Sequence, residues 1–286
     1  MTDQGFFHSV ELTELTLRVA DLAQVQAFYQ DVLGFAPLGA APGTVTLAPP
    51  GAPAGLLVLH AAADAPPRPR GAAGLFHVAF LYPNRTAWAR VLRRLLELDV
   101  QIGSADHGVS EALYLSDPEG NGIELYADRP PEAWPPRLPD GQQTMYTETL
   151  DVPGVLAEAH EPGPLLPATT RIGHVHLSVA DLAQAEHFYG AALGFAVTQR
   201  TYPGALFLGR DGYHHHIGAN TWRSRRAALP GTLGLAEFTV RVNDDDYAKV
   251  VARLEAAGHL REKSDEGVVA QDRDGLIVRI LRDDER

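Results

Sequence analysis

The sequence predicts an α+β protein that repeats one βαβββ module four times, two modules in each half of the chain. The first observation is an internal repeat, because residues 17–36 match residues 177–196 at 13 of 20 positions, 160 residues further along. The second is a change in the spacing of apolar residues, from every second residue to a helical period. His174, His176 and Ser178 alternate with apolar residues as in a half-buried strand, and a helical pattern follows. The third is a series of short apolar runs between Pro- and Gly-rich turns, which is typical of further strands.

The first half, residues 8–128, is expected to hold two modules, 8–62 and 72–128, separated by a Pro-rich stretch. Predicted strands lie at 15–19, 44–47 and 56–60 in the first module and at 75–82, 101–102, 112–116 and 123–126 in the second. Predicted helices lie at 21–33, ending at Gly34, and at 86–98. A tight DPEGNG turn at 117–122 leads into the last of these strands.

Residues 129–170 are rich in proline and are predicted to connect the halves. The second half, residues 171–286, is expected to hold modules 171–222 and 233–284. In the repeated stretch Asp181 is placed to cap a helix and Gly194 to end it. The other predicted elements are strands at 205–208, 214–221, 235–242, 268–271 and 276–281, and a helix at 245–257.

Composition excludes several classes of protein. The net charge of −12 argues against a nucleic-acid partner. Apolar runs stay short of the roughly 18 residues that a membrane span needs, and no leader pattern is present, so a cytoplasmic location is expected. The chain has no cysteine, so a metal would need nitrogen and oxygen ligands, and its 12 histidines can supply them.

The modules resemble the vicinal oxygen chelate superfamily, which includes glyoxalases, bleomycin-resistance proteins, fosfomycin-resistance enzymes and type I extradiol dioxygenases. The resemblance rests on the FY-x-x-x-LGF signature, the paired copies and the DPEGNGIELY hairpin, and it covers nearly the whole chain. Two stretches, HGVSEALYLSDPEGNGIELYADRP and GYHHHIGANTW, are similar to bacterial catechol-2,3-dioxygenases. The resemblance implies that the modules form two open barrels, each made of two paired modules, with a divalent metal on a concave face.

In this superfamily the metal ligands come from the first and last strands of the modules. The first-strand histidine of H-x-x-L-x-V falls on His174 in module three and, in a close form, on His77 in module two. The last-strand position is Glu124 in module two and lies near His216 in module three. The resemblance therefore implies His77, Glu124, His174 and His216 as metal ligands.

Module one offers poorer ligands, and module four offers none. The matching positions are Glu14 and a site near His60 in module one, and Leu235 and Arg279 in module four. We therefore expect modules two and three to hold the metal together, and modules one and four to pair without one. Bonds near 2.0–2.1 Å then predict that one nitrogen of His77 lies within about 4 Å of one nitrogen of His174.

Two histidines and one carboxylate are the facial triad of non-haem iron(II) oxygenases. The resemblance implies extradiol cleavage of a catechol-like aromatic by dioxygen, with Fe(2+) as the expected metal and Mn(2+), Ni(2+) or Zn(2+) as alternatives. Proton transfer is assigned to His215, His214 and Tyr213, and His216 is either the fourth ligand or a proton-transfer residue.

Two other functions stay open on the sequence. A glyoxalase-type isomerase or lyase would use four ligands on a bidentate oxygen substrate. A non-catalytic resistance protein would bind a small molecule without turnover. The sequence leaves open whether the protein forms a homodimer.

Overall fold

The computed structural model describes residues 6–7, 9–160 and 162–283 of the 286 in the chain. Residue 8, where the first module is expected to begin, and residues 284–286, which include the expected end of the fourth, lie outside the described residues. Within the described part, every helix is too short or too polar to cross a membrane.

Four stretches of the chain repeat the order of one strand, one helical segment and three strands. Module one comprises β1 (Val10–Val19), α1 (Leu22–Asp31), β2 (Ala36–Ala41), β3 (Thr44–Ala48) and β4 (Leu57–Ala61). Module two comprises β5 (Gly74–Leu81), α2 (Arg85–Glu97), β6 (Gly103–Asp106), β7 (Ser110–Ser116) and β8 (Gly122–Asp128). The connector carries a short 3-10 helix, η1 (Pro131–Ala133), and α3 (Val152–Glu158).

The second half continues the same plan. Module three comprises β9 (Arg171–Ser178), α4 (Leu182–Ala185), the π-helix η2 (Glu186–Ala192), β10 (Ala196–Gln199), β11 (Ala205–Gly209) and β12 (Ile217–Asn220). Module four comprises β13 (Gly234–Val242), α5 (Asp244–Ala256), β14 (Leu260–Lys263), β15 (Gly267–Gln271) and β16 (Ile277–Arg282). The predicted α+β fold of repeated modules is confirmed.

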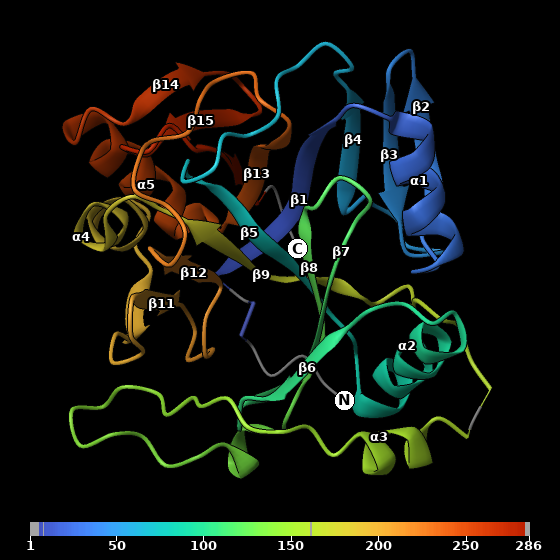
Figure 1. Cartoon of the computed structure of the whole chain (residues 1–286). Helices are drawn as coiled ribbons and strands as arrows, with labels where there is room; N and C mark the ends of the chain where they lie inside the picture. The colour runs from blue at the N-terminus through green and yellow to red at the C-terminus, as the bar shows by residue number, and fades with distance from the viewer. Residues whose placement is uncertain (1–5, 8, 161, 284–286) are drawn as a thin grey trace.

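The first strands of the modules pair in a crossed order. β5 runs antiparallel to β9, and β1 runs antiparallel to β13, so module two pairs with module three and module one with module four, as expected. β1 and β9 meet at Leu12 and Ile172, which joins the two pairs into one branched sheet that stays open. Figure 1 shows these strands at the centre of the molecule and the helices towards its periphery.

A polar cap fixes where the helical segment of each module begins. The side chains of Asp21, Asn84, Asp181 and Asn243 accept hydrogen bonds from backbone N–H groups of the first turn. Trp88 of α2 is fully buried and donates its indole N–H to the carbonyl of Leu125 on β8 (2.8 Å). The helix therefore covers one face of its sheet and leaves the other face for polar side chains.

The strand predicted at 101–102 lies instead at Gly103–Asp106, and three elements of module three differ from prediction: the helix, β10, which was not predicted, and the start of β12. The helix changes from α to π after Ala185, whereas the matching α1 is α-helical throughout; Gly190, a poor helix former, replaces Gln30 of the first copy. The strand predicted at 214–221 begins only at Ile217. The positive φ angles of Asp211 (54°) and Gly212 (81°) turn the chain sharply before it, so the three histidines precede the strand and do not alternate along it.

Candidate metal centre and active site

Three side chains from three neighbouring strands converge on one face of the module two–module three sheet. Glu124 Oε2 lies 2.9 Å from His77 Nε2 and 3.1 Å from His174 Nε2, and the two nitrogens are 3.3 Å apart. The last distance agrees with the prediction of about 4 Å or less. All three residues are buried, and their ligand atoms form a group that could hold a metal ion.

The donor set fits a divalent transition metal. Metal–ligand bonds of about 2.1 Å place adjacent octahedral donors about 3 Å apart, which is the spacing of these three atoms. Two imidazoles and one carboxylate on one face suit iron or another first-row metal better than calcium or magnesium.

The protonation states also fit a metal. Burial raises the pKa of Glu124, but the neighbouring His174 and His77 outweigh it and hold that pKa well below the ordinary value. Burial lowers the pKa of His174, which favours a neutral imidazole. An ionised carboxylate and neutral imidazoles are the forms that coordinate a cation.

Strand register explains the convergence. Ala79 of β5 pairs with Glu124 of β8 on one side and with His174 of β9 on the other. His77 lies two residues before Ala79 and shares its face, since side chains alternate along a strand. The small side chain of Ala79 leaves room between the ligands, and its fully buried methyl group contacts Tyr126 and Ala112 instead.

His216 does not join this group, so the expectation that it is the fourth ligand is corrected. Its Nε2 is 3.2 Å from the carbonyl of Phe6, and its Nδ1 accepts a hydrogen bond from the backbone N–H of Arg210 (3.2 Å). The ring packs against Phe7 and Phe195, and burial lowers its pKa to about 3. His216 thus ties the segment before β12 to Phe6 and Phe7 ahead of module one.

The structure places Gly218 at the position that corresponds to Glu124. Ile217 and Gly218 pair with Val175 and His176, as Ile123 and Glu124 pair with Val78 and Ala79. A Cβ atom at Gly218 would lie 2.8 Å from the ring of His176, so the imidazole occupies the space of a side chain there. Three ligands, with no fourth from β12, therefore face the centre.

His214 and His215, which precede His216 in the chain, connect the candidate metal centre to the carboxylate of Asp128 on β8. Asp128 Oδ1 lies 2.8 Å from His214 Nε2, and His214 Nδ1 lies 2.8 Å from His215 Nδ1. The ring of His215 packs against the ring of His174, with centroids 4.2 Å apart. Asp128, His214 and His215 thus form a chain of hydrogen bonds that ends beside a candidate ligand.

Hydrogen-bonding capacity fixes the tautomers in this chain. An ionised carboxylate only accepts, so His214 donates from Nε2, and in the neutral form of this ring Nδ1 is bare. His215 then donates from Nδ1 and keeps a bare Nε2. Burial holds the pKa of His215 well below its usual range, so the ring is neutral.

Tyr213 is further from the centre than expected. Its hydroxyl donates to Asp128 Oδ2 (2.9 Å) and is 2.7 Å from the hydroxyl of Tyr126. Burial and the charge of Asp128 raise its pKa well above the ordinary value. Tyr213 is buried and orients Asp128; it does not line the cavity described next.

A cavity of about 370 Å³ opens onto the candidate ligands. His215 and His176 line it next to the ligands, and the aromatic side chains of Phe76, Tyr202 and Phe207 form apolar walls. His176 Nε2 is buried and has no hydrogen-bond partner among the described atoms. The cavity therefore offers an apolar slot with a few nitrogen atoms at its metal-facing end, as small-molecule sites commonly do.

Two further residues, His107 and Tyr114, lie beside the candidate ligands. His107 Nε2 lies 2.7 Å from the hydroxyl of Tyr114, and both residues line the cavity. Burial and the charge of Glu124 raise the pKa of Tyr114 well above its usual range. The neutral phenol can donate to Glu124 and orient it, which is a common role beside a metal ligand.

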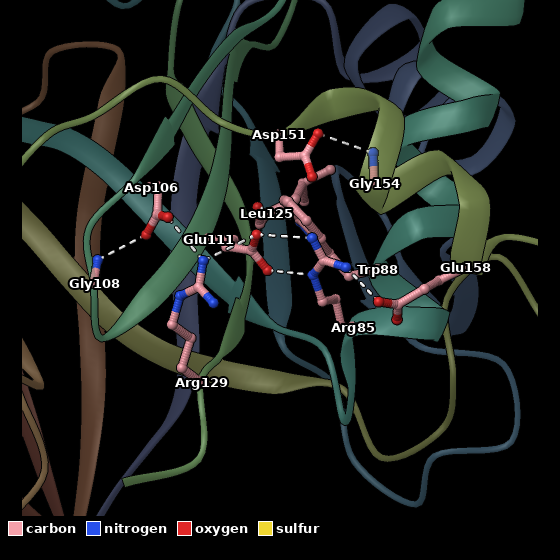
Figure 2. A network of polar contacts seen from close by, with 10 residues as sticks. All are labelled: Arg85, Trp88, Asp106, Gly108, Glu111, Leu125, Arg129, Asp151, Gly154 and Glu158. Carbon is pink, nitrogen blue, oxygen red and sulfur yellow. Dashed lines mark hydrogen bonds and ion pairs between the residues drawn. The ribbon is translucent and has the colours of Figure 1, made fainter. Parts of the chain in front are cut away.

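An ion-pair network holds the turn that carries His107 (Figure 2). The buried Glu111 of β7 accepts from Arg85 (2.5 and 3.0 Å) and lies 3.3 Å from Arg129. Arg129 also pairs with Asp106 (2.8 Å), whose other oxygen accepts from the backbone N–H of Gly108. The second contact of Arg85 is Glu158 of α3. These links join α2, α3 and the 106–108 turn to β7, which pairs with the strand that supplies Glu124.

Comparison with known proteins identifies related sequences. The chain matches the profile of the glyoxalase/bleomycin resistance protein/dioxygenase superfamily over residues 11–125 and 171–280. It is 41% identical over 263 residues to a catechol-2,3-dioxygenase of Bacillus subtilis (strain 168), a match that covers 90% of this chain and 91% of that protein.

Solved structures share the fold at low sequence identity. A protein of Bacillus subtilis subsp. subtilis str. 168 assigned as a dioxygenase gives a TM-score of 0.68 at 14% identity, over 97% of this chain and 86% of the other. Glyoxalase I from Zea mays gives a TM-score of 0.56 at 16% identity, over 96% and 92%. At these identities the similarity concerns the fold.

Proposed function

Because the chain belongs to the glyoxalase/bleomycin resistance protein/dioxygenase superfamily, we propose that it is a metal-dependent extradiol dioxygenase that opens a catechol-like ring. The observation that carries the proposal is the group of His77, Glu124 and His174 with Gly218 at the fourth position. Three ligands on one face leave adjacent positions for a bidentate substrate and dioxygen. The 41% identical catechol-2,3-dioxygenase of Bacillus subtilis supports the same reaction class.

His77, Glu124 and His174 would hold the metal between modules two and three, and we propose Fe(2+), with Mn(2+) as the nearest alternative. When bound, such a metal supplies a Lewis acid for the two catechol oxygens and an electron carrier between substrate and dioxygen. The apolar walls of the cavity would contact the faces of the catechol ring, fix its orientation and exclude water from it.

His215 is the proposed base for a catechol hydroxyl. The chain from Asp128 through His214 leaves its Nε2 unprotonated, and the residue lines the cavity next to His174. Uptake of a proton there is stabilised by Asp128, because a positive charge on His215 can move towards the carboxylate by shifting the proton between the two Nδ1 atoms. The unpartnered Nε2 of His176 is placed to accept a hydrogen bond from the substrate.

The glyoxalase-type alternative fits the site less well. From the sequence, a glyoxalase-type site is expected to use four ligands. The residue at the fourth ligand position is Gly218, which has no side chain and packs against the ring of His176. A three-ligand group with a neighbouring neutral histidine favours the dioxygenase.

Metal analysis of anaerobically purified protein tests the proposal first. We expect about one iron or manganese per chain in the wild type and background levels in His174→Ala. His60→Ala is the matched control, because His60 is exposed and bonds to Thr44. The metal-loaded wild type should consume oxygen with catechol and form a yellow ring-opened product, and His174→Ala should not.

Three outcomes would contradict the proposal. Metal-free wild type would leave a binding protein. Consumption of a thiohemiacetal without oxygen uptake would indicate an isomerase. Equal metal content in His174→Ala would place the ion elsewhere.

A further inference from the structure

A second cavity, of about 720 Å³, adjoins the candidate active site. Phe76, His77 and Tyr114 line both cavities, so the two spaces meet beside a candidate ligand. A substituent on a ring held in the first cavity would pass these three residues to reach the second.

The outer wall of the second cavity comes from two segments between modules, residues 62–73 and 221–233. They are tied together by backbone hydrogen bonds from Ala73 N–H to Arg226 O (2.9 Å) and from Arg225 N–H to Gly71 O (2.9 Å). Arg226 also donates from its side chain to the carbonyl of Arg70 (2.7 Å). The wall is therefore a built surface held by both modules of the pair.

This wall is positively charged in an acidic protein. The two segments contain five arginines, at 68, 70, 223, 225 and 226, and one acid, Asp64, whereas the whole chain has a net charge of −12. Arg68, Arg70 and Arg223 line the cavity, and the described residues that line it include no carboxylate. Among the described contacts, none of these three guanidinium groups pairs with an acid.

Arg68 is held in place without being neutralised. Its Nη1 donates to the carbonyl of Leu75 (2.7 Å), and the guanidinium lies over Gly74, where a Cβ atom would be 2.3 Å from Nη1. One bond uses one of five N–H donors, so the rest of the guanidinium stays available to an anion. Arginine binds a carboxylate through two parallel hydrogen bonds, which makes the contact specific as well as charged.

We propose that the second cavity is an anion subsite in which Arg68 and Arg223 bind a carboxylate group carried by the catechol substrate. The inference rests on the proposed function, because it assumes that the ring occupies the first cavity. It narrows the substrate class to carboxylated catechols, and Arg70, which also lines the cavity, adds positive charge.

Anaerobic binding tests the subsite without requiring turnover. The probes are 3,4-dihydroxybenzoate and 4-methylcatechol, which are similar in size and differ in the carboxylate, titrated by calorimetry into Zn(2+)-loaded protein. For Arg68→Gln/Arg223→Gln we expect the Kd of the carboxylated probe to rise at least about tenfold, and that of 4-methylcatechol to change less than about twofold. Arg68→Lys/Arg223→Lys should recover part of the affinity, since charge is kept and the bidentate geometry is lost.

Arg137→Gln/Arg273→Gln is the control, because it removes two positive charges from residues that do not line the cavity. Melting temperature and zinc content confirm that each variant is folded. Equal weakening of both probes, an equal effect of the control, or no preference of the wild type for the carboxylated probe would overturn the subsite. Absence of ring cleavage with any catechol in the iron-loaded enzyme would overturn the proposed function and leave the binding comparison intact.

Discussion

Asp128 controls the tautomer of the proposed base from two hydrogen bonds away. We predict that Asp128→Asn lowers kcat for catechol about 10- to 100-fold, because an amide can donate to His214 Nε2 and reverse the order of donors along the chain. KM and metal content should stay within about twofold, since Asp128 does not contact the metal group. Steady-state oxygen uptake and metal analysis measure both, and Asp140→Asn in the exposed connector is the control.

A structural role for Asp128 would give a different result. If the substitution lowered metal content or raised KM as strongly as it lowered kcat, then Asp128 would hold the fold around Tyr213 and would not set the direction of proton transfer. The ratio of the two kinetic effects therefore decides between the roles.

Residue patterns predicted the core of the site better than its surroundings. The resemblance to the superfamily, applied to matching positions of the modules, implied His77, Glu124 and His174, and Tyr126 and Asp128 could have been found by counting every second residue from Glu124 along β8. Aligning Ile217 with Ile123 would likewise have placed Gly218, and not His216, at the fourth position. The link from His214 to Asp128 joins residues 86 apart, and no local pattern predicts such a contact.

At the scale of elements, the same strand register builds an ion pair at the place that corresponds to the candidate metal group of the other module pair. Thr239 pairs with Arg279 as Ala79 pairs with Glu124, so Arg279 occupies the position of Glu124 and Glu237 that of His77. Arg279 donates to both oxygens of Glu237 (3.0 and 3.1 Å), and Glu14 lies in the place of His174. A fixed guanidinium thus supplies the positive charge between two acids. On the sequence, Leu235 was assigned to the position of His77. The register places Glu237 there, so that assignment was two residues too early.

We therefore predict that Arg279→Gln destabilises the protein by about 1–2 kcal/mol at neutral pH, a value between those of exposed and buried ion pairs. Burial and Glu237 raise the pKa of Glu14 above its ordinary 4.5, and Arg279 opposes that rise. In the variant the folded state holds the Glu14 proton more tightly than the unfolded state does. Stability should then increase as pH falls from neutral through the raised pKa, and this gain levels off below the unfolded value.

Urea unfolding of wild type and variant between pH 4 and pH 8 measures this difference. Arg282→Gln, which removes a pair at the exposed end of the same strand, should leave stability unchanged within error. An Arg279→Gln deficit that does not shrink on acidification would contradict the assigned role of Glu14.

Elements were predictable where local chemistry decides them. The start of the helix in module three followed from its capping residue Asp181, and the repeat located the first strand and helix of two modules. The start of β12 and the π-helix did not follow. Similarity to α1 favoured an uninterrupted α-helix despite Gly190, and the positive φ angles of Asp211 and Gly212 do not show in the apolar pattern of the residues that follow.

For the whole molecule, crossed pairing makes each half of the chain dependent on the other. Modules one and two lie on one side of the connector in sequence, and their partners lie on the other. Cutting the connector at the exposed Asp140–Gly141 turn should therefore leave the two fragments associated. A protease site inserted there lets the intact 30.9 kDa chain be cut after folding and metal loading.

We expect the cut protein to elute from a sizing column at the position of the uncut protein and to retain its metal. Strand β5 of one fragment pairs with β9 of the other, and the candidate ligands His77 and Glu124 lie on one fragment and His174 on the other. Unfolding in urea should separate them and release the metal. Had the modules paired in sequence order, each fragment would contain a complete pair and the two would part without denaturant. Separation of the native fragments would therefore refute crossed pairing and remove the basis for a metal shared between modules two and three.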